Sequence, residues 1–241
     1  MNPIVKVIIP AYNEAASIGK VIGDIPSIVS EIIGVSNNST DDTEDVARKA
    51  GATVLSEPRK GYGHACLKGM EYLAASTHFG NHSNSESNTT PIVVFLDGDY
   101  SDYPEQLTEI IKPIIEDQKD FVIGARNKDL RENGSMTGPQ IFGNWLATSL
   151  MKLFFRSTFT DLGPFRAIRY DKLLALNMED KTYGWTVEMQ LKVLRMKYLY
   201  MEIPVKYRNR IGVSKVSGTI KGAIFAGLKI LGWIFKYSFK R

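Results

Sequence analysis

Cysteine and histidine are scarce in this sequence. Its 241 residues include one cysteine, Cys66, and three histidines. A single cysteine cannot form an internal disulfide, and a zinc site needs several cysteine or histidine ligands. His78 and His82 are four residues apart, but the stretch around them is polar and lacks helical periodicity, which favours an ordinary surface loop over a metal site. The scarcity argues against a disulfide scaffold and against a zinc enzyme.

A secretory leader and a long uninterrupted apolar run are also missing. The first residues, MNPI, have neither the basic segment nor the long apolar segment of a signal peptide. The most apolar stretch, GAIFAGLKILGWIFKYSF near the C-terminus, is interrupted by Lys229 and Lys236, and these charges disfavour a transmembrane span. We therefore expect a cytoplasmic protein body.

The apolar C-terminal stretch is more typical of an amphipathic helix that lies in a membrane interface. Trp233, Phe235 and Tyr237 would then sit at the level of the lipid headgroups. A helix packed on its own domain or on a second subunit is the alternative. We expect a main domain over residues 1–215 and an interfacial helix over residues 216–241, peripherally associated with the inner face of the membrane.

Positive charge is concentrated towards the C-terminus, although the net charge is only +4. From Lys192 onward the chain has twelve lysines and arginines and one acid, Glu202. Such a segment favours anionic partners, namely a phosphorylated substrate, an anionic bilayer or nucleic acid. No RNA- or DNA-binding motif accompanies the charge, so we expect no nucleic-acid partner.

Short runs rich in valine and isoleucine alternate with amphipathic segments of helical length. This alternation predicts βαβ units and an α/β fold with a mostly parallel sheet. The expected strands are Val5–Ile9, Ile32–Val35, Thr53–Leu55, Ile92–Leu96, Phe121–Ile123, Phe165–Ile168 and Tyr200–Val205. The expected helices are Ser17–Ile25, Thr43–Lys49, Gly63–Ala75, Pro104–Glu116, Gln140–Phe155 and Trp185–Met196.

Two aspartates follow one of the most apolar of these strands. Asp97 and Asp99 flank Gly98 directly after Leu96. Open α/β sheets place their ligands at the carboxyl ends of parallel strands, and paired carboxylates suit Mg²⁺ or Mn²⁺. A metal ion there would neutralise the phosphates of a bound diphosphate. An acidic turn after a strand is the alternative.

Polar residues also follow the first and second expected strands. Pro10 would stop the first strand, Tyr12 can stack on a flat base, and Glu14 can bond a nucleoside or cap the next helix. The second strand runs into the polar stretch SNNSTD, which includes Asn37. We therefore expect three neighbouring strand ends to converge on one cleft.

Eight motifs follow one another along the chain: VIIPAYNEAASI, VSNNSTDDT, RKGYGHACLKG, VVFLDGDYSDYPE, VIGARN, TDLGPFRAIR, YGWTVEMQ and RIGVSKVSGT. The ordered set resembles the family 2 glycosyltransferases of the GT-A fold, particularly the dolichyl- or polyprenyl-phosphate hexose synthases. The resemblance implies a GT-A, Rossmann-like sheet flanked by helices. It also implies an inverting, metal-dependent transfer of a hexose from a UDP- or GDP-sugar to a polyprenyl or dolichyl phosphate. Transfer to a hydroxyl of a glycolipid or small metabolite is the alternative.

On the donor side, the resemblance implies that residues after the first strands line a nucleotide pocket. Asn37 stands where an aspartate usually touches the base, so an amide that donates and accepts replaces a charged acceptor. Asp97 would reach the ribose or sugar and Asp99 the metal ion, with Asp102 a weaker candidate. The implied donor-binding residues are Pro10, Tyr12, Glu14, Asn37, Lys60, Gly61, Asp97 and Gly98.

On the acceptor side, Arg126 matches the arginine that the prenyl-phosphate branch uses near the acceptor phosphate, which a planar guanidinium can grip through two hydrogen bonds. A surface arginine is the alternative. Asp161 and Arg166 resemble an acceptor segment of that branch, or they form a structural ion pair. Glu188 lies where many inverting relatives carry the general base. A phosphate acceptor needs no base, and Glu188 would then orient its neighbours.

The motif RIGVSKVSGT and the residues before it resemble a basic lid that folds over the diphosphate. The implied lid residues are Arg208, Arg210, Ser214 and Lys215. The arginines lie four and two places before Gly212, whereas the usual spacing is three, so either of them could meet the diphosphate.

Two other classes of protein could use a similar sheet. A nucleotidyltransferase normally carries a glycine-rich, basic loop after the first strand, where this chain has PAYNE. A non-catalytic module that keeps a nucleotide-sugar pocket is the other rival.

Overall fold

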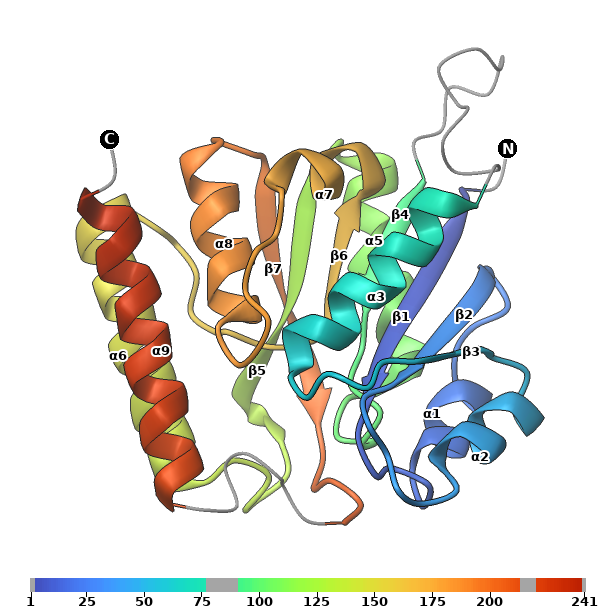
Figure 1. Cartoon of the computed structure of the whole chain (residues 1–241). Coiled ribbons are helices and arrows are strands. Elements are labelled where there is room, and N and C mark those ends of the chain that lie inside the picture. The colour runs from blue at the N-terminus through green and yellow to red at the C-terminus, as the bar shows by residue number, and fades with distance from the viewer. Residues whose placement is uncertain (1–2, 77–90, 213–219, 240–241) are drawn as a thin grey trace.

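The computed structural model describes residues 3–76, 91–212 and 220–239, with only the backbone described at 220–226 and 239 (Figure 1). His78, His82, Ser214 and Lys215 lie outside the described residues. The strands are β1 (Val5–Ala11), β2 (Val29–Ser36), β3 (Thr53–Ser56), β4 (Ile92–Phe95), β5 (Phe121–Arg131), β6 (Arg166–Arg169) and β7 (Tyr200–Tyr207). The helices are α1 (Ile18–Gly23), α2 (Thr43–Lys49), α3 (Tyr62–Ala75), the 3₁₀ turn η1 (Pro104–Gln106), α5 (Leu107–Glu116), α6 (Gly138–Phe155), α7 (Tyr170–Leu176), α8 (Trp185–Arg195) and α9 (Ile220–Phe239).

The strands form one sheet in the order β3-β2-β1-β4-β6-β5-β7. Neighbouring strands are parallel except at β6, which runs antiparallel to both β4 and β5. The predicted α/β fold with a mostly parallel sheet is therefore confirmed. Because β1, β2, β4 and β5 share one direction, their carboxyl ends lie at the same edge of the sheet.

Helices cover both faces of the sheet (Figure 1). On one face, α1, α2 and α5 enclose an apolar core that includes Ile18, Ala47 and Ile110. On the other face, α3, α6, α7, α8 and α9 enclose a second core that includes Cys66 and Trp185. Burying these side chains supplies most of the favourable free energy of folding. The two cores fix the strand ends from which the functional residues project.

Pro10 lies inside β1 and does not stop it, contrary to the sequence expectation. The strand continues to Ala11, and Pro10 pairs with Val35 of β2. On the other side of β1, pairing with β4 reaches only Ile8. A proline is tolerated where no neighbouring strand needs its missing N–H. The extra length of β1 brings the residues after it level with the end of β2.

Helix α9 packs against α6 and α8 (Figure 1). Trp233 and Tyr237 are 8% and 7% exposed, and Ile234 is fully buried. The expectation that Trp233 and Tyr237 lie at the level of lipid headgroups is therefore wrong, because these rings complete the core between the helices. Phe235 is 44% exposed on the outer side. Within the described residues, no helix is long and apolar enough to cross a membrane.

Candidate active site

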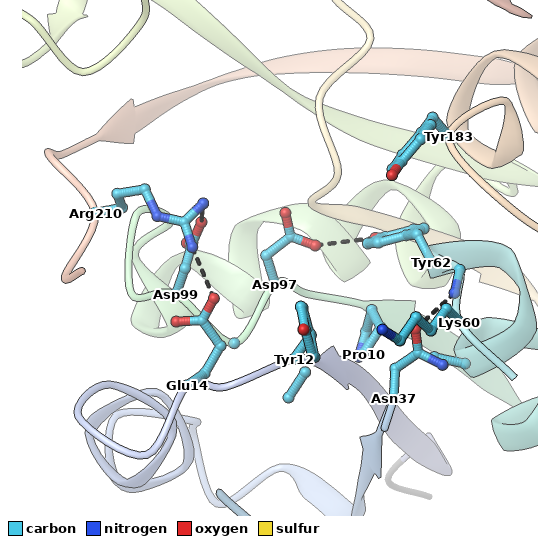
Figure 2. A pocket seen from close by; sticks show the side chains of 14 residues that line it. Pro10, Tyr12, Glu14, Asn37, Lys60, Tyr62, Asp97, Asp99, Tyr183 and Arg210 are labelled. Carbon is cyan, nitrogen blue, oxygen red and sulfur yellow. Dashed lines mark hydrogen bonds and ion pairs between the residues drawn. The ribbon is translucent and has the colours of Figure 1, made fainter. Parts of the chain in front are cut away.

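A cleft of about 260 Å³ lies at the carboxyl ends of β1, β2 and β4 (Figure 2). It brings together side chains that are far apart in the sequence. The predicted residues that line it are Pro10, Tyr12, Glu14, Asn37, Lys60, Gly61, Asp97, Gly98, Asp99 and Arg210. The lining is completed by Ala11, Tyr62, Ala65 and Tyr183, which were not assigned to the site. Of these, Tyr183 begins the motif YGWTVEMQ, which is the sequence signal that marks it.

Asp97 lies in the middle of this cleft, directly after β4. Its Oδ1 accepts a hydrogen bond from the hydroxyl of Tyr62 at 3.0 Å (Figure 2). Removal of water from around the carboxylate, followed by the nearby charge of Asp99, raises the pKa of Asp97 to about 7. A cation placed beside this carboxylate would favour its ionised form.

Both carboxylate oxygens of Asp99 have partners in the structure. Oδ1 accepts a hydrogen bond from the backbone N–H of Ser101 at 2.9 Å, and Oδ2 lies 3.0 Å from a guanidinium nitrogen of Arg210. The other terminal nitrogen of Arg210 donates to Oε1 of Glu14 at 2.7 Å (Figure 2). The buried Nε of Arg210 has no hydrogen-bond partner among the described residues. A phosphate oxygen in the cleft would satisfy this donor.

The two aspartates fit a Mg²⁺ or Mn²⁺ site that is completed by a substrate. Within the described residues, no group of three or more acidic, histidine or cysteine side chains could hold a metal ion. A metal that binds together with phosphates needs only one or two carboxylates, because phosphate oxygens and water supply the other ligands. Arg210 already pairs with Asp99. A metal ion at Asp99 would therefore bind the carboxylate beside Arg210 or displace Arg210 from it.

Asn37 holds the loop between β3 and α3 in place. Its side-chain Nδ2 donates to the carbonyls of Arg59 at 2.7 Å and Glu57 at 3.3 Å, and its Oδ1 accepts from the N–H of Gly61 at 2.8 Å. An aspartate could not donate to two carbonyls. Asn37 stands where the resembling family usually has an aspartate, and its hydrogen bonds to the loop that carries Lys60 explain why an amide occupies this position.

A second cleft of about 450 Å³ lies beside the end of β5. Positively charged side chains of β5 and residues of α6 form much of its wall. Its lining includes Arg126, Lys128, Arg131, Met136, Ile141, Asn144, Thr160, Asp161 and Glu202. The predicted acceptor residues Arg126 and Asp161 therefore belong to a different cleft from the aspartate pair.

Arg126 and Asp161 form a buried bidentate ion pair. The guanidinium Nε and a terminal nitrogen donate to the two carboxylate oxygens at 2.8 and 2.7 Å. This finding corrects the expected alternative of an ion pair between Asp161 and Arg166. Arg166 is fully buried, lines neither cleft and donates to three backbone carbonyls.

Glu188 also lies outside both clefts. Its side chain is fully buried, accepts hydrogen bonds from the backbone N–H groups of Glu179 and Asp180 at 2.9 and 2.7 Å, and pairs with Lys192 at 2.8 Å. Glu188 is therefore not placed to take a proton from an acceptor hydroxyl in either cleft, and the expectation of a general base at this residue is wrong. Its contacts agree with the expectation that it orients neighbouring residues.

Glu202 lines the second cleft and was not expected in the site. It is the only acid in the basic C-terminal region, and this isolation was the available sequence signal. Burial raises the pKa of its carboxyl group. Its two oxygens accept hydrogen bonds from Thr160 and from the N–H of Asp161. Glu202 thus fixes the segment that presents Asp161 to Arg126.

The two predicted lid arginines have different places. The guanidinium of Arg208 stacks on the ring of Tyr100, 3.4 Å from its centroid, and donates to the carbonyl of Tyr100 at 2.7 Å. Arg208 therefore fixes the loop after β4, while Arg210 lines the first cleft.

Asp102 lines neither cleft, and its buried carboxylate oxygens have no hydrogen-bond partner among the described residues. Burial raises the pKa of Asp102 well above its usual range.

Comparison with known proteins places this geometry in a family. Residues 6–176 match the model of glycosyl transferase family 2. An uncharacterized glycosyltransferase of Mycobacterium tuberculosis is 33% identical over 229 residues, which cover 92% of this chain and 94% of the relative. Undecaprenyl-phosphate mannosyltransferase of Micrococcus luteus is 28% identical over 228 residues, or 89% of this chain and 88% of the relative. Dolichyl-phosphate hexose transferase of Haloferax volcanii is 30% identical over 226 residues, or 90% and 88%.

Solved structures share the fold. Glucosyl-3-phosphoglycerate synthase from Mycobacterium tuberculosis, crystallised with Mn²⁺, uridine diphosphate and glucosyl-3-phosphoglycerate, superimposes with a TM-score of 0.72 and 20% identity. The alignment covers 98% of this chain and 80% of that chain. The family match decides against a nucleotidyltransferase and against a non-catalytic module. The chain belongs to glycosyl transferase family 2, and it is a glycosyltransferase with the GT-A fold.

Proposed function

We propose that this glycosyltransferase is an inverting, metal-dependent enzyme that moves a hexose from a UDP- or GDP-sugar to a polyprenyl or dolichyl phosphate or a similar lipid acceptor. The observation that carries the proposal is the pair of clefts, one lined by Asp97, Asp99 and Arg210 and the other by Arg126 and further cations. The undecaprenyl-phosphate and dolichyl-phosphate transferases among the relatives support a lipid phosphate as acceptor. The Mn²⁺ and uridine diphosphate of the structural neighbour support the donor and the metal.

The donor would occupy the first cleft. Asp97 and Asp99 would hold Mg²⁺ or Mn²⁺, which neutralises the charge that builds on the departing diphosphate. Tyr12 offers a ring on which the base can stack. Lys60 and Arg210 supply positive charge to the phosphates, and the unpartnered Nε of Arg210 is a ready donor. Catalysis would then be mainly electrostatic and positional.

The transfer would be a direct in-line displacement. An oxygen of the acceptor phosphate forms a bond to the anomeric carbon, while the bond from that carbon to the diphosphate breaks and its electron pair stays with the nucleoside diphosphate. Attack opposite the leaving group inverts the anomeric configuration. Because the attacking oxygen is already an anion, no general base is required. This chemistry agrees with the position of Glu188 outside both clefts.

The acceptor phosphate would bind in the second cleft. Lys128 is exposed there, and Arg131 makes its hydrogen bond to the weak sulfur acceptor of Met136 at 3.2 Å. Both side chains are available to meet a phosphate as cations. The carboxylate of Glu202 in this cleft is engaged by the 160–161 segment, so a hydroxyl acceptor would find no free base there. A phosphate acceptor is favoured for that reason.

An apolar face beside this cleft suits a lipid chain and a membrane surface. Of the thirteen large apolar residues that are exposed in the described chain, seven lie on α6 and α9. They are Ile141, Phe142, Trp145, Leu153, Phe154, Leu228 and Phe235. Clustered exposed apolar side chains mark interaction sites, and aromatic residues with nearby lysines suit a membrane interface. We place the α6–α9 face against the inner face of the membrane, with the second cleft opening beside it.

A donor and acceptor panel tests the proposal. Pure protein with Mn²⁺ would be incubated with UDP- and GDP-sugars, with and without a short prenyl phosphate, and released nucleoside diphosphate would be measured. We expect release that depends on the prenyl phosphate and a product of inverted anomeric configuration. Transfer only to hydroxyl acceptors would contradict the phosphate assignment, and a retained configuration would contradict the single displacement.

A further inference from the structure

Asp180, in the loop between α7 and α8, connects the C-terminal helix to the rest of the molecule. Its side chain is fully buried. Oδ2 accepts a hydrogen bond from the indole N–H of Trp233 at 2.6 Å and lies 3.1 Å from Nζ of Lys229, both on α9. Oδ1 accepts hydrogen bonds from the backbone N–H groups of Thr182 at 2.7 Å and Gly184 at 3.1 Å. One carboxylate therefore fixes both α9 and the shape of its own loop.

The same loop lies directly against the N-terminal end of α3. The backbone N–H groups of Gly63 and His64 donate to the carbonyls of Thr182 and Lys181 at 3.2 and 3.1 Å. A Cβ atom on Gly63 would overlap the carbonyl of Asp180, and one on Gly61 would overlap that of Lys181. Only glycine permits such a close approach of two backbones. Movement of the loop would therefore be transmitted to the start of α3.

The start of α3 and this loop form one wall of the first cleft. Lys60, Gly61 and Tyr62 line the cleft from the α3 side, and Tyr183 lines it from the loop. Tyr62 and Tyr183 lie on the side away from Arg210 (Figure 2). The hydroxyl of Tyr62 donates to Asp97. A chain of direct contacts thus runs from α9 through Asp180 to the carboxylate in the centre of the cleft.

We propose that Asp180 is a positioning residue through which α9 sets the affinity of the first cleft for the nucleotide sugar. The proposal rests on the proposed function for the identity of the ligand, but the contacts that transmit the effect are independent of it. Asp180 touches no substrate. It acts by holding Tyr62 and Tyr183 at the distance that the bound donor requires.

Asp180→Asn tests the coupling with a nearly isosteric change. The variant places an amide nitrogen or a neutral oxygen opposite Trp233 and Lys229, so it weakens the hold on α9. We expect the KM for the nucleotide sugar to rise by about tenfold, as expected for the loss of hydrogen bonds to a charged group. We expect kcat and the KM for the acceptor to stay within about threefold, because every residue assigned to the metal and to the acceptor is still present. Asp171→Asn on α7, where the carboxylate is 50% exposed, is the matched control and should change neither constant.

Hydrogen exchange of the backbone separates coupling from general destabilisation. We expect faster exchange of the amides of Gly63 and His64 in Asp180→Asn, with unchanged exchange in the strands. Trp233→Phe removes the indole N–H that bonds Asp180, together with part of the buried ring, and should shift the same amides in the same direction. If Asp180→Asn fails to fold, the Trp233→Phe variant still tests the coupling between α9 and α3.

Unchanged exchange at Gly63 and His64 in the folded variants, or exchange raised equally throughout the chain, would overturn the proposal. An unchanged donor KM together with altered exchange would overturn the link to donor affinity. If the wild-type protein binds no nucleotide sugar, the proposed function fails instead, and the exchange measurements still decide whether Asp180 couples α9 to α3.

Discussion

The guanidinium of Arg126 grips the carboxylate of Asp161 through two hydrogen bonds, at 2.8 and 2.7 Å. Both side chains are nearly buried, with 11% and 6% exposed. We predict that Asp161→Asn lowers the free energy of unfolding by about 3–5 kcal/mol, because it leaves a buried arginine without its counter-charge. Urea unfolding at pH 7 measures the loss. Asp171→Asn is the exposed control, and an equal loss in both variants would contradict the prediction.

The same pair predicts how stability depends on pH. Burial opposes ionisation of Asp161, but the charge and hydrogen bonds of Arg126 outweigh it and lower the pKa of the carboxyl group below its ordinary value. The contribution of the pair is then fully present above the unfolded pKa of about 3.9 and is lost as the pH falls through the folded pKa. The stability difference between wild type and Asp161→Asn should stay constant from about pH 7 to 5 and shrink below about pH 4. A difference that persists unchanged in acid would count against the pair.

Asn37→Asp tests the amide clamp on the loop that carries Lys60. An aspartate would face two carbonyl oxygens that it cannot bond, and the buried mismatch should cost about 1–3 kcal/mol. We expect a lower free energy of unfolding and a higher KM for the donor. Asn38→Asp, at the neighbouring position, is the control. Improved donor binding by Asn37→Asp would show instead that the side chain reads the base.

Replacing Phe142 and Trp145 by serine tests the proposed membrane face. Both side chains are 60% exposed on α6, so their loss should leave the fold intact. We expect binding to anionic vesicles, measured by co-sedimentation, to fall by about tenfold or more, because two aromatic side chains no longer bury apolar area in the interface. Leu199→Ser, at a 57% exposed position directly before β7 and outside α6 and α9, is the control for lost apolar surface. Equal binding by the α6 variant and the wild type would remove the basis for this face.

The sequence was most informative where an apolar strand runs into polar residues. Asp97, Asp99, Asn37 and Glu14 were placed in one cleft because parallel strands end at one edge of a sheet, and the structure brings them together. Periodicity also located the strands, since alternation with helices is a local signal. These inferences depend on chain direction and burial, which the sequence encodes directly.

The sequence does not predict in the same way which side chains pair with each other. Asp161 pairs with Arg126, 35 residues away, although Arg166 is nearer in sequence. Trp233 lies in the core, where its indole N–H donates to Asp180, 53 residues away. The apolar character of α6 on both sides was a signal for a second contact surface, but helical periodicity alone does not say which side meets the core. Such choices are made by tertiary packing.

Turnover by Asp99→Ala at saturating Mn²⁺ tests the central claim most directly. Removing the carboxylate leaves Arg210 paired with Glu14, so we expect a native circular dichroism spectrum. Transfer from the nucleotide sugar should fall by about a thousandfold or more, because several kcal/mol of transition-state stabilisation are lost with the metal site. Asp117→Ala, at an exposed position after α5, should retain the wild-type rate. A wild-type rate in Asp99→Ala would contradict the assignment of this cleft as the metal-dependent donor site.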